Sequence, residues 1–376
     1  MNKRVYLDNN ATTEIDSRVV EAMTQELSSP PSNPSSAHSF GQEARSRLVK
    51  ARETIAKVFQ VKPTEVIFTS GGTESMNLLL RGLIPPTNSW HIITSDVEHS
   101  CVYQTLKEIT KEERISHLPA GLWGAIRPEA VMAAIRPDTK LIVLSAVNSE
   151  TGVKTDIEAI AEIALNAKIP FIVDGVALMG KELFQIPKGV AGIGFSAHKF
   201  HGPKGVGFAI IRSSLALHPQ CTGGGQEMGR RSGTENLPGI MGLAKAVELL
   251  HLELPKGTEL MKALKERLEV ELIDRISPVI VNGQGPRVVN TSNISFPRVS
   301  GEDLLISLDL AGIAVSHGSA CSSGALEPSR ILNQMGVDAK VSKSSIRISL
   351  SRYTTLEEIE HCVDVIVQIV NKFRTI

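Results

Sequence analysis

The sequence predicts an α/β protein with a large domain, whose mainly parallel sheet is sandwiched between helices, and a smaller α+β domain. Its 376 residues exceed the size at which one hydrophobic core keeps growing, which favours two domains. From about Val66, short apolar runs alternate with helical stretches, as in α/β proteins. Around Leu254-Pro255-Lys256-Gly257 this pattern breaks, and the smaller domain is expected to follow.

Six short apolar runs predict the strands of the large sheet. Their hydrophobicity is nearly continuous, as expected where helices cover both faces of a sheet. The runs are residues 66–68, 91–94, 141–144, 171–173, 193–195 and 206–211. Among the covering segments, residues 156–167 repeat apolar side chains at the three-and-four spacing of a helix. Because ligands bind at the carboxyl ends of parallel strands, functional residues are expected there.

Helix ends and the second domain follow from periodicity and turn residues. One helix of the large domain is expected to start near Met76. After the break come a helix, strands near 293–296 and 345–350, and a closing helix. That last helix begins at Thr355, with Glu358 at the spacing of a capping box.

Composition and charge exclude several classes of protein. Hydrophobic residues make up 42% and charged residues 21% of the chain, which is typical of folded globular proteins. Lys and Arg total 40, as do Asp and Glu, so the chain lacks the one-signed field of a nucleic-acid or acidic-membrane binder. No apolar run approaches the roughly 18 to 20 residues of a membrane helix, and Met1 to Leu7 lacks the apolar stretch of a secretion signal. We expect a cytoplasmic protein whose partners are small molecules or proteins.

The four cysteines are too few and too scattered for a disulfide framework or a CxxC zinc site. A free cysteine usually packs as a small hydrophobic residue, and we favour this structural role for Cys101 and Cys362. Cys321 differs, because it lies in a Gly- and Ser-rich stretch, residues 316–324, that offers little to pack against. We therefore expect Cys321 to be chemically active.

The most informative segment for a cofactor is residues 196–205, between two predicted strands. Lys199 lies there at a strand end, where its amine can hold a carbonyl cofactor, and Ser196 and His198 are suited to binding a phosphate. On this segment alone, a surface loop with a solvated lysine fits equally well. Asp174, at the end of another buried strand, needs a partner, and the protonated pyridine nitrogen of pyridoxal phosphate is one.

Two further groups fit the same cofactor. Thr69 to Ser75 form a Gly-rich turn between a strand and a helix, so the backbone N–H groups of Gly72 and Thr73 can face a phosphate. The turn is not a P-loop, which needs Lys followed by Ser or Thr. His99 follows another strand; taken alone it is more often structural, but beside a pyridoxal ring it can stack and shuttle protons.

Segments in order along almost the whole chain match the motifs of one family. They are residues 6–13, 33–38, 69–74, 98–99, 196–205, 223–227, 231–236, 318–329 and the strand that contains Arg347. Together they resemble the cysteine desulfurases of the NifS/IscS type, within the class V aminotransferase family of fold-type I enzymes that depend on pyridoxal phosphate.

The resemblance implies domain limits, an assembly and a substrate site. It implies a large cofactor-binding domain of residues 14–254 and a small domain of residues 1–13 and 255–376 that carries the catalytic cysteine loop. It also implies a homodimer in which Thr234 of one chain reaches the cofactor phosphate of the other. Arg347, with Asn33 near it, is expected to bind the substrate carboxylate, for which the bidentate geometry of arginine is suited.

The activity that the resemblance implies is removal of sulfur from L-cysteine. Lys199 removes the α-proton of the substrate, and Cys321 takes the sulfur as a persulfide, leaving L-alanine. His99 or His317 is expected to accept the thiol proton. The loop then delivers the sulfur to an acceptor or iron–sulfur scaffold protein, for iron–sulfur clusters, tRNA thiolation or cofactor synthesis. No metal is expected beyond a transient contact of Cys321 with an iron–sulfur cluster.

Two positions depart from the family pattern. Ser149 stands where an Asn, and Ala177 where a Gln, normally donates to the phenolate oxygen of the cofactor. An alternative is therefore a desulfurase-like protein with reduced activity, or a lyase or transaminase that acts on another amino acid. The product distinguishes these functions, because a transaminase yields a keto acid and needs a second amino substrate.

Overall fold

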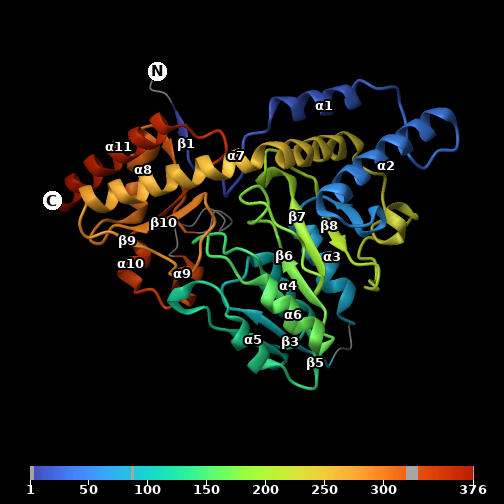
Figure 1. Cartoon of the computed structure of the whole chain (residues 1–376), viewed down its shortest axis with the longest axis horizontal. Coiled ribbons are helices and arrows are strands. Elements are labelled where there is room, and N and C mark those ends of the chain that lie inside the picture. Colours follow the sequence, from blue (N-terminus) through green and yellow to red (C-terminus); the bar gives the residue numbers. More distant parts are fainter. Residues whose placement is uncertain (1–3, 86–88, 319–328, 376) are drawn as a thin grey trace.

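The computed structural model describes residues 4–85, 89–318 and 329–375, and its largest sheet has seven strands (Figure 1). In spatial order the strands are β2 (Val66–Thr69), β8 (Gly207–Ile211), β7 (Val190–Ser196), β6 (Phe171–Asp174), β5 (Thr139–Ser145), β3 (His91–Ser95) and β4 (Ile115–Leu118). The neighbours from β7 to β4 are all parallel, whereas β8 runs antiparallel to β7 and β2. The mainly parallel sheet and its six predicted strands are confirmed. Strand β4 was not predicted, because it is a half-buried edge strand with polar Ser116 and His117 at its centre.

Helices cover both faces of this sheet, which explains the unbroken hydrophobicity of its strands. In β5, Ile142 and Leu144 pack into one hydrophobic cluster, while Leu141 and Val143 pack into another on the opposite face. Helices α3 (Gly72–Leu83) and α4 (Ser100–Ile109) supply the second cluster; α2 (Ser39–Phe59), α5 (Pro128–Ala134), α6 (Ile157–Ala167) and α7 (Leu237–Arg275) supply the first. The predicted three-layer α/β architecture is therefore confirmed.

Helix α7 corrects one expectation. The break predicted at residues 254–257 is absent, because α7 continues through Pro255. A proline removes the N–H that would bond the carbonyl four residues earlier, here that of His251. Both residues are exposed, so water can satisfy that carbonyl, and the helix persists. Figure 1 shows α7 extending from α11 (Leu356–Thr375) at one end to α1 (Ser17–Leu27) and α2 at the other.

The rest of the chain forms two smaller sheets. One is antiparallel, in the order β12 (Ser345–Ser349), β10 (Thr291–Ser295), β9 (Ile280–Val281); in the other, β1 (Val5–Tyr6) runs parallel to β11 (Ile313–Ala314). Three helices complete this region: α8 (Gly301–Leu310), α9 (Arg330–Gln334) and α10 (Ala339–Lys343). The capping box of α11 is confirmed, since the N–H of Glu358 donates to Thr355 Oγ1 (3.3 Å) and the N–H of Thr355 to Glu358 Oε2 (3.0 Å). Of the helices in the described parts of the chain, none is both long and apolar enough to cross a membrane.

A buried carboxyl group joins the carboxyl ends of two strands. Glu98, which follows β3 and is 2% exposed, accepts hydrogen bonds from Ser95 Oγ and from Ser145 Oγ at the end of β5, both at 2.5 Å. Burial, which disfavours the charged form, and to a smaller extent the nearby Asp174 raise the pKa of Glu98 to about 7, although the hydrogen bonds from Ser145 and Ser95 oppose this. Glu98 is therefore partly protonated at neutral pH and holds together the edge of the sheet next to His99.

The raised pKa of Glu98 predicts how stability changes with pH. The folded chain binds this proton more tightly than the unfolded chain, whose glutamate has the ordinary pKa of 4.5, so stability falls as pH rises from about 4.5 to about 7. Glu98→Gln removes this dependence. Relative to the wild type, the variant should gain about 3 kcal/mol at most between about pH 5 and about pH 8, measured by urea unfolding. The control Glu43→Gln, at an exposed position of α2, should show no such change, and an equal difference at both pH values for Glu98→Gln would contradict the prediction.

Candidate active site

A cavity of about 190 Å³ lies at the carboxyl ends of the parallel strands. The structure brings together around it nine of the residues that were singled out in the sequence: Gly72, Thr73, His99, Ser149, Asp174, Ala177, Ser196, His198 and Lys199. Asp174 ends β6, Ser196 ends β7, and Lys199 ends the short 3-10 helix η4 (Ala197–Lys199) that follows β7. Because these strands are parallel neighbours, their last residues meet at one edge of the sheet.

The N-terminus of α3 forms one wall of the cavity. The helix begins at Gly72, four residues before the predicted start. The prediction placed the start too late because the first turn carries no apolar periodicity. A Cβ atom at Gly72 would lie 2.5 Å from Val176 Cγ2, so only glycine allows this close approach. The N–H groups of the first helical turn have no carbonyl partner within the helix, and together with the helix dipole they suit a phosphate.

Lys199 is held by the N-terminal segment of the chain. Its Nζ donates hydrogen bonds to the backbone carbonyls of Asn10 and of Ala11, the latter at 3.0 Å. His198 lies beside it, with Nδ1 3.2 Å from Thr12 Oγ1. Burial, and secondarily the charge of Lys199, lower the pKa of His198 to about 4, so its imidazole is neutral at physiological pH.

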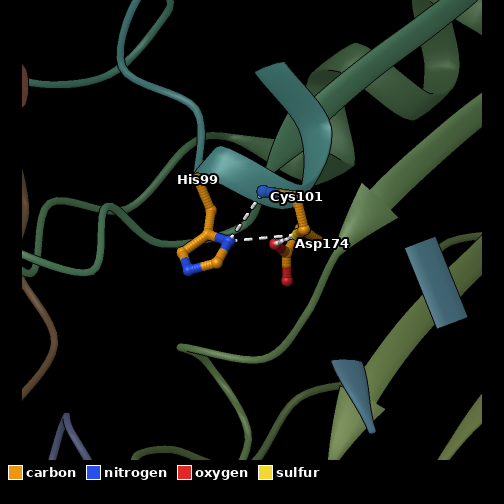
Figure 2. Close-up of side chains that lie close together, drawn as sticks. All are labelled: His99, Cys101 and Asp174. Carbon is orange, nitrogen blue, oxygen red and sulfur yellow. Dashed lines mark hydrogen bonds between the residues drawn. The ribbon is translucent and has the colours of Figure 1, made fainter. Parts of the chain in front are cut away.

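Asp174, His99 and Cys101 form a second group, shown in Figure 2. The carboxylate of Asp174 is buried; Oδ1 accepts the N–H of Val176 (3.0 Å), and Oδ2 lies 3.8 Å from Cys101 Sγ. His99 is the N-cap of α4, where its Nδ1 accepts the N–H of Cys101 (3.1 Å) and lies 3.0 Å from Cys101 Sγ. Burial and then the carboxyl groups of Asp174 and Glu98 raise the pKa of the Cys101 thiol well above its ordinary value, so it is protonated.

Cys101 and Lys181 are cavity residues that the sequence interpretation missed. The packing role expected for Cys362 is confirmed, because it is buried in α11, but Cys101 contacts both the apolar core and the cavity. Lys181 is 3% exposed and its Nζ donates to the carbonyl of Lys199 (3.2 Å). Burial, followed by the charge of Lys199, lowers the pKa of Lys181 to about 7. An isolated lysine after the small and apolar residues 175–180 was the available signal.

The remaining predicted residues that the structure describes do not line the cavity. Arg347, in β12, is 3% exposed: one guanidinium nitrogen donates to Asp8 Oδ1 (2.8 Å) and Ser316 Oγ (3.1 Å), and the other to the carbonyl of Ser149 (3.1 Å). Asn33 lies between α1 and α2, and its Oδ1 accepts the N–H of Ser35. Thr234 is exposed in the segment before α7, and Cys321 lies outside the described residues.

The chemistry of this residue set matches the functional groups of pyridoxal phosphate. A lysine amine suits its aldehyde, a buried carboxylate suits its protonated pyridine nitrogen, and a glycine-lined helix N-terminus suits its phosphate. The neutral His198 and the hydroxyl of Ser196 add hydrogen-bonding groups beside that N-terminus. The residues present therefore fit this cofactor.

Comparison with known proteins agrees with this geometry. Residues 5–362 match the family model described as aminotransferase class-V. The chain is 42% identical over 381 residues to the cysteine desulfurase IscS of Dictyoglomus turgidum, which covers 100% of this chain and 97% of that protein.

Solved structures show the same fold. A NifS-like protein superposes with a TM-score of 0.91 at 36% identity, over 98% of this chain and 100% of that chain. A protein described as SspA in complex with cysteine has a TM-score of 0.81 at 32% identity, over 93% of this chain and 100% of that chain. With a family model that spans nearly the whole sequence and relatives that match it from end to end, the chain belongs to the class-V aminotransferase family, among the cysteine desulfurases of the NifS and IscS type.

Proposed function

We propose that this cysteine desulfurase uses pyridoxal phosphate to convert L-cysteine into L-alanine and keeps the sulfur as a persulfide on Cys321. One observation carries the proposal: Lys199, Asp174 and the N-terminus of α3 converge on a single cavity. The relative whose solved structure contains cysteine supports the choice of substrate.

The cavity residues divide the binding of the cofactor among them. Lys199 would hold it through its amine, Asp174 would keep its pyridine nitrogen protonated, and Gly72 and Thr73 would bind its phosphate. When bound, pyridoxal phosphate supplies an electron sink that makes the α-proton of the substrate acidic. Once the amine of the substrate has taken its place, the Nζ of Lys199 would accept that proton as a neutral amine.

Arg347 is suited to hold the carboxylate of the substrate. Asp8 and the carbonyl of Ser149 engage its two terminal nitrogens, while its Nε is buried and has no hydrogen-bond partner among the described residues. An unpaired buried donor is costly, so a carboxylate that reached Nε would gain a charge-assisted hydrogen bond. Asn33 would have to move to bind the same carboxylate, since its Oδ1 accepts the N–H of Ser35 and it makes no hydrogen bond to Arg347 among the described residues.

Cys321 is the proposed nucleophile. Its Sγ, as a thiolate, forms a bond to the sulfur of cysteine while the carbon–sulfur bond of the substrate breaks, and alanine retains the carbon skeleton. The described residues on both sides of its segment reach the site: Ser316 bonds to Arg347, and Arg330 donates to the carbonyl of Glu98, next to His99. His99 or His317 accepts the thiol proton; Nδ1 of His317 donates to the carbonyl of Ser345 (2.6 Å), which leaves Nε2 as an acceptor.

We further propose a homodimer, in which Thr234 of one chain binds the cofactor phosphate in the other, and an acceptor or iron–sulfur scaffold protein that takes the sulfur. The exposure of Thr234 in a single chain supports the first point. A large domain of residues 14–254 and a small domain of residues 1–13 and 255–376 are consistent with the pairing of β1 with β11, which joins the N-terminal segment to the C-terminal part of the chain.

The second candidate function is reduced activity or a different amino-acid substrate. The side chains of Ser149 and Ala177 at the cavity wall support it. Ala177 contributes no polar side-chain atom to the cavity, and Ser149 contributes a short hydroxyl. Asn148 does not line the cavity, because its Oδ1 accepts the N–H groups of Glu150 and Thr151, both at 3.0 Å, beside the chain turn. Positions 149 and 177 therefore place no amide donor in the cavity, and neither does the neighbouring Asn148.

The role of Lys199 predicts a spectroscopic result. Lys199→Ala should abolish the visible absorption band of lysine-bound pyridoxal phosphate and with it the release of alanine and sulfide from cysteine. Lys188→Ala, at an exposed position, is the control and should keep both. An unchanged visible band in Lys199→Ala would remove Lys199 from this role.

The role of Cys321 predicts a separation of binding from turnover. Cys321→Ser should bind cofactor and cysteine as the wild type does, yet release no sulfide, because a hydroxyl is a poor nucleophile towards sulfur. Mass spectrometry of the wild type after one turnover should find the extra sulfur on Cys321. A persulfide on Cys101, Cys221 or Cys362 instead would assign the chemistry to another cysteine.

Replacing Ser149 and Ala177 by the residues usual in the family should lower the pH at which the visible band of the bound cofactor titrates. Ser149→Asn combined with Ala177→Gln adds amide donors that stabilise negative charge on the phenolate oxygen of the bound cofactor, each such bond being worth about 1.5 to 3 kcal/mol. The visible band should titrate at a pH lower by about one to two units for each donor that reaches the oxygen, and cysteine turnover should be faster. Identical absorbance titrations of both forms would show that these positions do not contact that oxygen.

A further inference from the structure

We propose that the cofactor-free chain binds a divalent cation of the zinc class through His99 Nδ1, Cys101 Sγ and Asp174 Oδ2, and that this cation and the cofactor exclude each other. The three residues lie at the N-cap and first turn of α4 and at the end of β6, and each offers a ligand atom within 4.8 Å of the other two (Figure 2). The cation site stands on these residues alone, whereas the mutual exclusion rests on the proposed function.

Two of the three distances between these atoms are close to those of tetrahedral coordination, and the third lies within 4.8 Å. Adjacent ligand atoms around zinc lie roughly 3.3 to 3.8 Å apart, given bonds of about 2.3 Å to sulfur and about 2.0 Å to nitrogen or oxygen. Cys101 Sγ lies 3.0 Å from His99 Nδ1 and 3.8 Å from Asp174 Oδ2, so small side-chain rotations are enough. Imidazole, thiolate and carboxylate are the three ligand types that zinc prefers, and the cavity leaves the fourth position open.

The surroundings prepare two of the ligands and supply negative charge. The N–H of Val176 holds Asp174 Oδ1, which orients the carboxylate and leaves Oδ2 for the cation. Asp174 Oδ2 lies 3.8 Å from Cys101 Sγ, so one cation can contact the carboxylate and the sulfur together. Binding replaces the thiol proton, which leaves to solvent, and the N–H of Cys101 gives up its hydrogen bond to His99 Nδ1.

Competition with the cofactor follows from shared residues. The carboxylate of Asp174 cannot ligate a cation through Oδ2 and also hold a protonated pyridine nitrogen, since both are positively charged. His99 lines the same cavity and would have to turn towards the cation. Metal binding would therefore keep the protein in a cofactor-free state, and the cofactor would protect the site from metal.

Cobalt(II) is the probe for the test, because a bond between cobalt and thiolate absorbs in the near ultraviolet. The full-length chain carries Cys221→Ser and Cys321→Ser, so that Cys101 and the buried Cys362 are its remaining thiols, and is freed of cofactor. One equivalent of Co²⁺ should produce the band, and Zn²⁺ should remove it by displacement. Adding Cys101→Ala should abolish the band and weaken Zn²⁺ binding by at least about tenfold.

Asp174→Asn is the second variant, because it keeps the thiol and removes the carboxylate; Zn²⁺ binding should again weaken by at least about tenfold. Glu43→Gln is the matched control and should bind as the parent does.

A parent chain without the band, or a band that survives Cys101→Ala, would overturn the cation site. Preloading with pyridoxal phosphate should block Co²⁺ uptake; simultaneous binding of both would overturn the exclusion. A chain that shows the band but never takes up pyridoxal phosphate would overturn the proposed function and leave the cation site standing.

Discussion

The site depends on the parallel alignment of β3, β5, β6 and β7, whose carboxyl ends meet at one edge of the large sheet. Each of these strands ends in or is followed by a polar residue that lines the cavity, and this alignment brings residues from His99 to Lys199 into one volume. The alignment in turn requires apolar side chains on both faces of every strand, which the two hydrophobic clusters provide. The Glu98 bridge between Ser95 and Ser145 joins two of the strand ends directly.

Burial disfavours the charged form of several titratable groups of this site. It lowers the pKa of His198 to about 4 and that of Lys181 to about 7, and it raises the pKa of the Cys101 thiol. Amines and imidazoles that lose their charge can accept protons, which is what a site for proton transfer requires. The carboxyl group of Asp174 is oriented by the N–H of Val176, and its Oδ2 faces Cys101.

The N-terminal segment connects the two parts of the molecule at the site. Strand β1 pairs with β11, Asp8 binds Arg347, and the carbonyls of Asn10 and Ala11 hold Lys199. The amine proposed to hold the cofactor and the guanidinium proposed to hold the substrate are thus positioned by residues only two or three places apart. Helix α7 also runs through both parts without interruption, so the two parts are joined by this helix as well as by the N-terminal segment.

The sequence by itself determined six of the seven strands of the large sheet and the candidates Asp174 and Lys199, because a run buried on both faces is unbroken in hydrophobicity and a polar residue close after it is conspicuous. It also identified the departures at Ser149 and Ala177, which the structure places at the cavity wall. Local patterns misjudged α7, since whether a proline ends a helix depends on whether water reaches the freed carbonyl. The places of Cys101 and Lys181 were decided only by tertiary structure. Cys101 meets Asp174, 73 residues later, because strand order brings α4 and β6 together, and no local periodicity records that neighbourhood.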